Sequence, residues 1–178
     1  MQTILETRRL TLREMAQADY KDLAEILQDE QCMYAYEHAF SDEEVQTWLD
    51  KQLARYREDG FGLWAVLDKE SGRFVGQVGL TIQDVDGVEE LEIGYLLKRK
   101  YWHLGYATEA ALGCKNYAFN VLGRERVVSI IRDTNLASQK VALRTGMQVE
   151  RSFIKHYHGM DMLHYLFAVL KPEAKTVR

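Results

Sequence analysis

Hydrophobic and polar positions in the first third of the chain predict a strand followed by two helices. Residues 9–13 alternate polar and apolar side chains, as a half-buried strand does, and residues 19–28 then repeat apolar side chains at helical spacing. A second helix is expected after Ser41, because Ser41 and Glu44 have the spacing of a capping box and an amphipathic stretch follows them. Gly60 is expected to end this helix, since glycine readily adopts the left-handed conformation found after helix C-termini.

The middle of the chain has the pattern of an antiparallel meander. Residues 63–67, 74–82 and 91–97 are apolar stretches of strand length. Turn segments containing glycine, serine or aspartate separate them, around residues 71–72 and at residues 84–87. Connections this short join neighbouring antiparallel strands.

Helices and strands alternate in the last part of the chain. The expected elements are a helix over residues 106–122, a strand over 126–131, a short helix that Asn135 caps and Gly146 ends, and strands over 148–157 and 162–170. The long helix should bury Ala110, Cys114, Tyr117, Ala118 and Val121. A strand, a helix and a second strand in this order favour a parallel crossover.

Together these elements predict one domain over residues 1–178 with an α/β (α+β) fold. No repeat, linker or low-complexity segment interrupts the chain. We expect a mixed, mostly antiparallel central sheet of about six or seven strands, with helices on both faces. The 178 residues, 47% of them hydrophobic, are enough for one sizeable core.

Composition excludes several classes of protein. No apolar stretch is long enough for a membrane-spanning helix, and the N-terminus lacks the apolar core of a secretory signal, so we expect a soluble, cytoplasmic protein without a membrane partner. Cys32 and Cys114 lie far apart without metal-ligand spacing, so we expect both to be reduced and structural, and we expect no metal site. We expect no nucleic-acid partner, because the chain has no basic stripe with interleaved aromatic residues.

The net charge of −4 is unevenly distributed along the chain. Residues 1–60 carry 14 acidic and 7 basic side chains, whereas residues 61–178 carry 13 acidic and 16 basic ones. A solvated helical face accounts for such a bias. A functional explanation is also open, in which the acidic part attracts a cationic acceptor and the basic part holds an anionic cofactor.

Residues 95–109 form the segment that points most directly to function: an apolar strand, a basic loop and a helix that starts after a glycine. The first N–H groups of a helix have no partner within the helix and carry a partial positive charge, so a phosphate binds there readily. An ordinary helix start with a glycine cap explains the same pattern. The backbone N–H groups expected to bind the anion are those of His103, Leu104, Gly105, Tyr106, Ala107 and Thr108.

Four segments occur together in a recognisable order. They are residues 7–13, the strand at 92–97, the loop at 98–109, and residues 135–138 with Gly146 and Met147 downstream. The set resembles the GNAT superfamily of acyl-CoA-dependent N-acetyltransferases, and within it the branch of ribosomal-protein N-terminal (alanine/serine) acetyltransferases. The likeness covers essentially the whole chain. It departs from the superfamily pattern at Trp102 and His103, so binding would depend on backbone N–H groups of the loop.

This resemblance implies acetyl-CoA as co-substrate and a GNAT-like acyl-CoA N-acyltransferase fold, in which a splayed pair of parallel strands receives the pantetheine arm. It implies that backbone groups of Tyr95, Leu96 and Leu97 bind that arm and the thioester carbonyl. It also implies that Asn135 hydrogen-bonds the arm and that Ser138 lies near the sulfur, where a hydroxyl eases departure of the thiolate. From the residues alone, the strand is buried sheet, and the other two residues are the N-cap and first turn of a helix.

The attacking amine must be neutral, which bears on the choice of a base. A peptide α-amine, with a pKa of about 7.7–8.0, is roughly a tenth deprotonated at pH 7, so a weak base or a water relay suffices. Glu92, on the strand before the splay, is the first candidate base, although it could equally be a solvent-facing strand residue. His156 is the second, although a single histidine in a strand is more often structural. Glu109 is expected to support the helix start.

We therefore expect an acetyl-CoA-dependent N-acetyltransferase in which the amine attacks directly within a ternary complex. A protein N-terminal α-amine is the first candidate acceptor, and a small amine such as a polyamine, amino acid or aminoglycoside is the second. A non-catalytic acyl-CoA-binding sensor is the alternative from another class of protein. A nucleotide-binding protein is disfavoured, because neither a phosphate-loop motif nor a dinucleotide glycine triplet occurs. Either a monomer or a homodimer fits the sequence.

Overall fold

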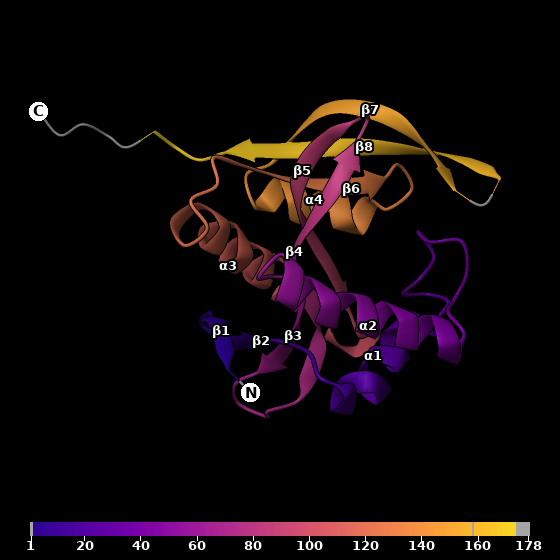
Figure 1. The fold of residues 1–178 in the computed structure, drawn as a ribbon, viewed down its shortest axis with the longest axis vertical. Coiled ribbons are helices and arrows are strands. Elements are labelled where there is room, and N and C mark those ends of the chain that lie inside the picture. The colour runs from indigo at the N-terminus through magenta and orange to yellow at the C-terminus, as the bar shows by residue number, and fades with distance from the viewer. Residues whose placement is uncertain (1, 158, 174–178) are drawn as a thin grey trace, which may run out of the picture.

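The computed structural model describes residues 2–157 and 159–173 and builds them around one eight-stranded sheet (Figure 1). The strands are β1 (Thr3–Glu6), β2 (Leu10–Arg13), β3 (Leu63–Asp68), β4 (Phe74–Val85), β5 (Val88–Leu97), β6 (Arg126–Arg132), β7 (Gln148–Tyr157) and β8 (Met160–Leu170). The α-helices are α1 (Tyr20–Leu27), α2 (Asp42–Glu58), α3 (Tyr106–Asn120) and α4 (Leu136–Arg144). The strand order across the sheet is β1-β2-β3-β4-β5-β6-β8-β7.

The junction between β5 and β6 divides this sheet into two parts. All other neighbouring strands pair antiparallel, whereas β5 and β6 run parallel and pair only where Glu92 lies opposite Val128. The hydroxyl of Ser129 then donates a hydrogen bond to the carbonyl of Ile93 at 2.8 Å, and no further pairing follows in the described chain. In Figure 1, β7 and β8 lie across the top of the molecule and β1 to β3 lie at its lower end, so the two parts face one another across this junction.

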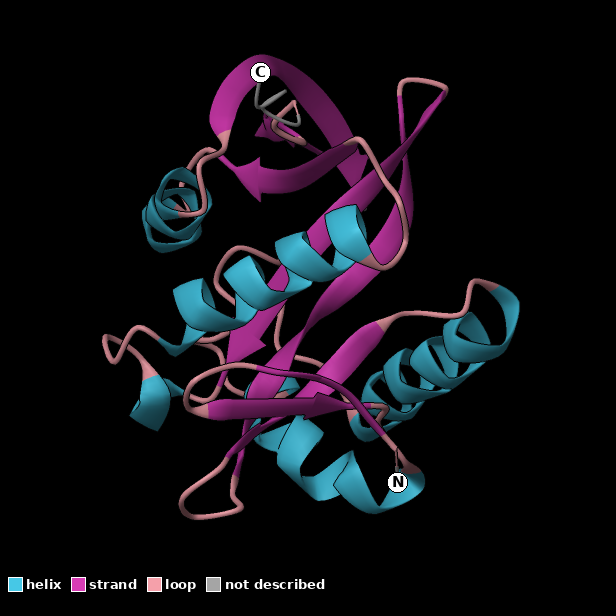
Figure 2. Ribbon diagram, turned by 90° about the vertical axis from the view of Figure 1, so that its left-hand side faces the viewer, coloured by secondary structure: helices cyan, strands magenta, loops and turns pink. Residues whose placement is uncertain are grey.

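Helices cover both faces of the sheet (Figure 2), and the alternation of side chains along β3 shows why. Trp64 and Val66 belong to a buried cluster that includes the small residues of α3, such as Ala110. Leu63 and Ala65 belong to a second cluster, formed with buried side chains of α1 and α2. Successive side chains of a strand point to opposite faces, so a strand that is apolar on both sides is buried between two helical layers.

The predicted fold class is confirmed: the sheet is mixed and mostly antiparallel, with one parallel pair and helices on both faces. It has eight strands rather than six or seven because residues 3–6 add an edge strand. Ile4 and Leu5 in that segment are consecutive apolar residues, so the sequence lacks the alternation of apolar and polar positions that would have predicted this strand. The expected burial of Val121 was wrong, because α3 ends at Asn120 and leaves that side chain 65% exposed.

Two further predictions concern the cysteines and membrane spans. Cys32 and Cys114 are both free and buried, as expected. None of the described helices is long and apolar enough to cross a membrane.

Glu109, in the first turn of α3, ties the start of that helix to the N-terminal strands. Its carboxylate accepts hydrogen bonds from the Thr7 hydroxyl at 2.6 Å and from the backbone N–H and the Nε of Arg9 at 2.7 and 2.6 Å. Partial burial raises the pKa of Glu109, but these hydrogen bonds lower it more, so the pKa lies below its usual range. Arg9 also donates to the Leu104 carbonyl at 2.9 Å and lies over the Tyr106 ring, so the same contacts hold the loop before α3.

We predict that Glu109→Gln lowers the free energy of unfolding at pH 7 by about 1.5–3 kcal/mol, the usual contribution of hydrogen bonds to a charged group. The pKa of this carboxyl is lower in the folded than in the unfolded protein, so its contribution is present above the unfolded value of 4.5 and is lost as the pH falls through the folded pKa. Urea denaturation at pH 7 and at acidic pH measures both effects.

Glu125→Gln is the matched control, because the Glu125 side chain is 79% exposed, and its replacement should change the free energy of unfolding by less than about 0.5 kcal/mol. Equal losses for the two variants at pH 7 would show that the Glu109 contacts do not stabilise the fold.

Candidate functional site

The loop before α3 presents a row of backbone N–H groups. His103 and Gly105 both have positive φ, 60° and 79°, and α3 starts directly after Gly105. From Gly105 to Thr108, no backbone N–H donates a hydrogen bond to another group of the described chain. Four consecutive donors at the positive end of a helix are therefore available to an anion. This geometry fits the anion seat that the sequence predicts over His103–Thr108.

At the end of β5, before this loop, the backbone of Tyr95 has hydrogen-bonding groups that no neighbouring strand pairs with. The Ile93 carbonyl points toward β6, where Ser129 donates to it. Backbone groups of a strand alternate in direction, so the N–H and C=O of Tyr95 point to the same side, where β6 no longer pairs with β5. The Leu97 carbonyl, by contrast, already accepts from the Trp102 indole at 2.9 Å. Of the three predicted backbone contacts at Tyr95, Leu96 and Leu97, the geometry therefore favours the first.

The diverging ends of β5 and β6 open into a cavity of about 330 Å³. Its walls come from α2, β3, β4, β5, β6, the N-terminus of α4, β7 and β8, and from the loop before α2. Five of the predicted site residues line it together: Glu92, Tyr95, Leu96, Asn135 and Ser138. The anion seat, Leu97 and His156 do not line it.

Glu92 lies where β5 and β6 part. Its carboxyl oxygens accept from the Ile130 N–H at 3.3 Å and from the Thr81 hydroxyl at 3.4 Å. Burial raises the pKa of Glu92; the Ile130 hydrogen bond and the charges of Lys155 and Arg55 oppose this effect without cancelling it. A carboxyl whose pKa is raised is a better proton acceptor near neutral pH than an ordinary surface carboxylate.

Asn135 and Ser138 lie at the start of α4, on the other side of the splay. The Asn135 side-chain oxygen accepts from the Ser138 N–H at 3.1 Å, as an N-cap does, and from the Tyr34 hydroxyl at 2.6 Å. The Tyr95 hydroxyl donates to the Ser138 carbonyl at 2.7 Å, which holds the helix start against β5. The Ser138 hydroxyl makes no hydrogen bond within the described chain and is available to a group in the cavity.

His156 is placed away from these groups. Its side chain is 79% exposed and pairs with Asp161 on the neighbouring strand. The structure therefore does not bring His156 into the cavity that Glu92 and Ser138 share.

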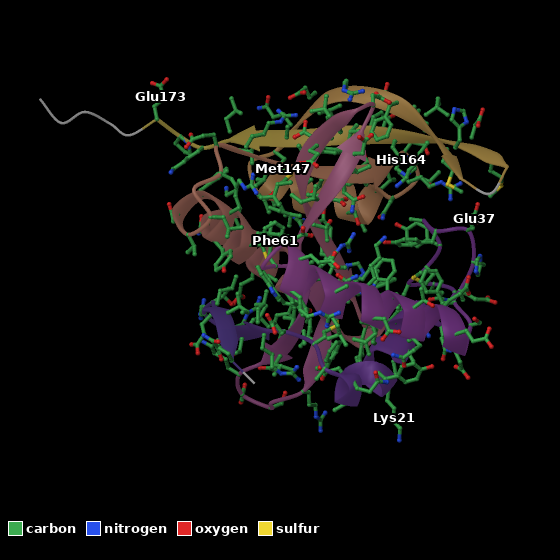
Figure 3. The ribbon with its side chains drawn as sticks, viewed as in Figure 1. Lys21, Glu37, Phe61, Met147, His164 and Glu173 are labelled. Carbon is green, nitrogen blue, oxygen red and sulfur yellow. The ribbon has the colours of Figure 1, made fainter. Side chains whose placement is uncertain are left out.

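A different histidine, His164 on β8, lines the cavity (Figure 3). Its Nδ1 lies 3.0 Å from the Met162 carbonyl, which only accepts hydrogen bonds, so the ring proton resides on Nδ1 and Nε2 is left as an acceptor. Burial lowers the pKa of His164, which is therefore neutral at pH 7. The alternation of buried Met162, His164 and Leu166 along the strand was a sequence signal for this inward position.

The walls of the cavity are predominantly cationic. The described lining residues include four cations, Lys51, Arg55, Arg132 and Lys155, and one carboxylate, Glu92. Two of the cations come from the acidic first part of the chain, so the charge balance of that part does not describe the site. Sequence reasoning missed them because the polar face of α2 has the pattern of a solvated helix. Among the described residues, no three histidine, cysteine, aspartate or glutamate side chains gather to hold a metal ion.

Comparison with known proteins identifies similar sequences and structures, most of them described as acetyltransferases. The family described as "Acetyltransferase (GNAT) domain" matches residues 9–148. The uncharacterized protein YkkB of Bacillus subtilis is 32% identical over 154 residues, which cover 86% of this chain and 90% of YkkB. A GNAT-family acetyltransferase from Bacillus anthracis has a TM-score of 0.81 at 24% identity, over 93% of this chain and 97% of that chain. The ribosomal L7/L12 alpha-N-protein acetyltransferase RimL, solved with coenzyme A, has a TM-score of 0.77 at 15% identity, over 95% of this chain and 98% of that chain.

We predict that Gly105→Glu weakens coenzyme A binding more than about 100-fold, because a carboxylate placed at a phosphate seat repels the phosphate. Isothermal titration calorimetry on the folded variant measures the effect. Gly123→Glu is the matched control, since Gly123 also has a positive φ of 65° and open space around it. It carries the same backbone strain and charge outside the seat and should bind normally. Normal binding by a folded Gly105→Glu protein would contradict the assignment of the loop.

Proposed function

Since this chain belongs to the GNAT family of acetyltransferases, we propose that it transfers an acetyl group from acetyl-CoA to a primary amine, the α-amine at a protein N-terminus. The observation that carries this proposal is the position of Glu92, a carboxyl with a raised pKa in the same cavity as the free hydroxyl of Ser138. A proton acceptor and a hydrogen-bond donor on opposite sides of a splayed strand pair are the two groups that aminolysis of a thioester uses.

Acetyl-CoA supplies an activated acetyl thioester when it is bound. The residues present fit this molecule in three places. The free N–H groups from Gly105 to Thr108 suit its pyrophosphate. The unpaired backbone of Tyr95 and the side chain of Asn135 suit the amide groups of its pantetheine arm. Tyr34 bonds to Asn135 at 2.6 Å, so binding at that point requires the tyrosine to share or yield this acceptor.

In the proposed mechanism, each residue handles one change of charge. Glu92 accepts a proton from the amine as the nitrogen bonds to the thioester carbon. The Tyr95 N–H donates to the carbonyl oxygen as negative charge develops on it; a donor in such a place typically contributes about 3–4 kcal/mol. The Ser138 hydroxyl donates a hydrogen bond to the sulfur as the carbon–sulfur bond breaks and so stabilises the departing thiolate, which then takes a proton from solvent; Glu92 returns its proton to solvent.

The α-amine is favoured over a lysine side chain by the strength of the base that each needs. With a pKa of about 7.7–8.0 an α-amine is already partly neutral at pH 7, whereas lysine, with a pKa of about 10.4, is not. A single carboxyl such as Glu92 is therefore adequate for an α-amine. The structural neighbour RimL is itself described as an α-N-protein acetyltransferase, which adds support.

The test is release of free thiol from acetyl-CoA with a panel of peptides, amino acids and polyamines, and mass spectrometry to locate the acetyl group. We expect turnover with an α-amine and none without an acceptor. Binding of acetyl-CoA without turnover on any amine would identify a non-catalytic sensor instead. Acetylation of polyamines alone would identify a small-molecule enzyme.

The same assay measures the contribution of Ser138. Ser138→Ala should lower kcat at least about tenfold and change acetyl-CoA affinity far less, since a hydrogen-bond donor to the departing sulfur acts in the transition state. Ser152→Ala, at an exposed position of β7, is the control and should change neither quantity. Unchanged kcat in Ser138→Ala would remove this hydroxyl from the mechanism.

The pH profile distinguishes Glu92 from His164, the other side chain of the cavity that can accept a proton. Because burial raises the pKa of Glu92, the carboxylate form is lost as the pH falls through that raised value, and kcat at saturating acceptor should fall with it. Glu92→Gln should lower kcat at least about 100-fold and remove this acid limb, whereas the limb that protonation of the free amine gives to kcat/KM should remain. His164→Gln is the matched variant and should keep the acid limb of kcat. Loss of the acid limb in His164→Gln but not in Glu92→Gln would make the histidine the base.

A further inference from the structure

Three cations from two elements gather at one side of the cavity. Lys51 and Arg55 lie four residues apart on α2, so both project from the same face of that helix, and Lys155 lies on β7. Burial lowers the pKa of Lys51, and the nearby charges of Arg55 and Lys155 lower it further. Like charges held this close destabilise one another unless an anion lies between them.

Among the described residues, no carboxylate lies within ion-pair distance of these cations, and Glu92 acts on Arg55 and Lys155 only through its longer-range charge. Within the described chain, none of the three cations forms an ion pair with an aspartate or glutamate. Of the groups in the described chain, Arg55 donates only to the side-chain oxygen of Gln52, at 3.2 Å. Elsewhere in the described chain, Lys98 is paired with Asp22 at 2.6 Å and Arg13 with Asp19 at 2.8 Å. The three cations of the cavity have no such carboxylate partner among the described residues.

The phosphate seat does not account for the cluster. The residues of that seat, His103–Thr108, do not line the cavity, and the seat uses backbone N–H groups rather than side chains. The cations instead share the cavity with Glu92, the group that receives the amine in the proposed mechanism.

We propose that the acceptor amine carries an anionic group, a carboxylate or a phosphate, a few bonds from its nitrogen, and that Lys51, Arg55 and Lys155 bind this group. The proposal rests on the proposed function. The acceptor then lies with its amine at Glu92 and its anion at the three cations, so opposite charges meet at both ends. Polyamines and aminoglycosides, which bring only positive charge, meet repulsion at the cluster. An acidic amino acid and a protein N-terminus that begins with an acidic residue both have the required chemistry.

Isosteric pairs of acceptors test the proposal and separate its two sources. The free-amine arm compares L-aspartic acid α-amide, whose single carboxylate is on the side chain, with L-asparagine amide, and the peptide arm compares Asp-Ala-Gly-Leu with Asn-Ala-Gly-Leu, in the thiol-release assay. We expect kcat/KM to be at least about tenfold higher for the acidic member in one arm, mostly through KM, because its carboxylate meets unpaired cations. The arm in which this preference occurs identifies the source.

Removal of the two exposed lysines tests the cluster itself. Lys51→Gln/Lys155→Gln should reduce the preference for the acidic acceptor to less than about threefold, with little change for the neutral acceptor. The control Lys21→Gln/Arg57→Gln removes two charges outside the cavity and should keep the preference. Lys21 projects from the lower end of the molecule, away from His164 of the cavity (Figure 3). If the Lys51 and Lys155 variant raises the KM of acetyl-CoA and leaves acceptor preference intact, the cations bind the co-substrate and the proposal is overturned.

Binding of product separates failure of this proposal from failure of the proposed function. Calorimetry with the coenzyme A complex should show tighter binding of the α-amide of N-acetyl-L-aspartic acid than of N-acetyl-L-asparagine amide, by at least about tenfold. Tighter binding without turnover on any amine supports the anion site and contradicts the acetyltransfer proposal. Equal binding, together with equal turnover of acidic and neutral acceptors, overturns the anion site and leaves acetyl transfer intact.

Discussion

Pairing between β5 and β6 at a single position, Glu92 opposite Val128, is the constraint on which the rest of the structure depends. Beyond this point the backbone of Tyr95 faces a gap instead of a strand. A polar backbone group left buried without a partner costs about 1–3 kcal/mol, so the gap favours a ligand that supplies hydrogen bonds. Because β5 and β6 do not pair beyond Glu92, the fold leaves room for an extended ligand between them.

The surroundings keep the gap from closing or widening. Tyr95 reaches across to the Ser138 carbonyl and so connects β5 with α4. At the far end of the strand, Trp102 bonds to the Leu97 carbonyl and turns the chain into the loop before α3. Arg9 donates to the carboxylate of Glu109, in the first turn of α3, and to the Leu104 carbonyl, and so holds that loop against the N-terminal strands. The anion seat and the cavity are therefore set relative to one another by contacts that span most of the chain.

Most of the fold was predictable from sequence because local patterns of hydrophobic, capping and turn residues mark its helices and strands. The capping box at Ser41 and the glycine before α3 mark helix starts that the structure confirms. The cavity was only partly predictable, because its side chains come from elements far apart in sequence. Glu92 was identified through its strand. The alternation along β8 marks His164 only as facing inward, and the cations of α2 carry no local signal that separates them from surface residues. His156 was selected because histidine titrates near neutral pH and, by family resemblance, the turn after it borders the acceptor site; the hairpin places its side chain in solvent.

We therefore propose an acetyltransferase in which backbone geometry positions the donor and side-chain charge selects the acceptor. The excess of acidic side chains in residues 1–60 suggests a cationic acceptor, whereas the cations of the cavity suggest an anionic one. The count over the segment misleads because it includes side chains that point into solvent. Folding places Lys51 and Arg55 in the cavity and leaves most of the acidic side chains of the same region outside it. The electrostatics of a site thus depend on which few residues line it rather than on the average of the segment.

Hydrogen–deuterium exchange with and without acetyl-CoA tests the central claim most directly, because it reports on the backbone N–H groups that the account invokes. Acetyl-CoA should slow exchange in two separate segments, the end of β5 around Tyr95 and the loop and helix start at residues 103–108. Unchanged exchange in both segments, or protection confined to the groove between β1 and α3, would contradict the account.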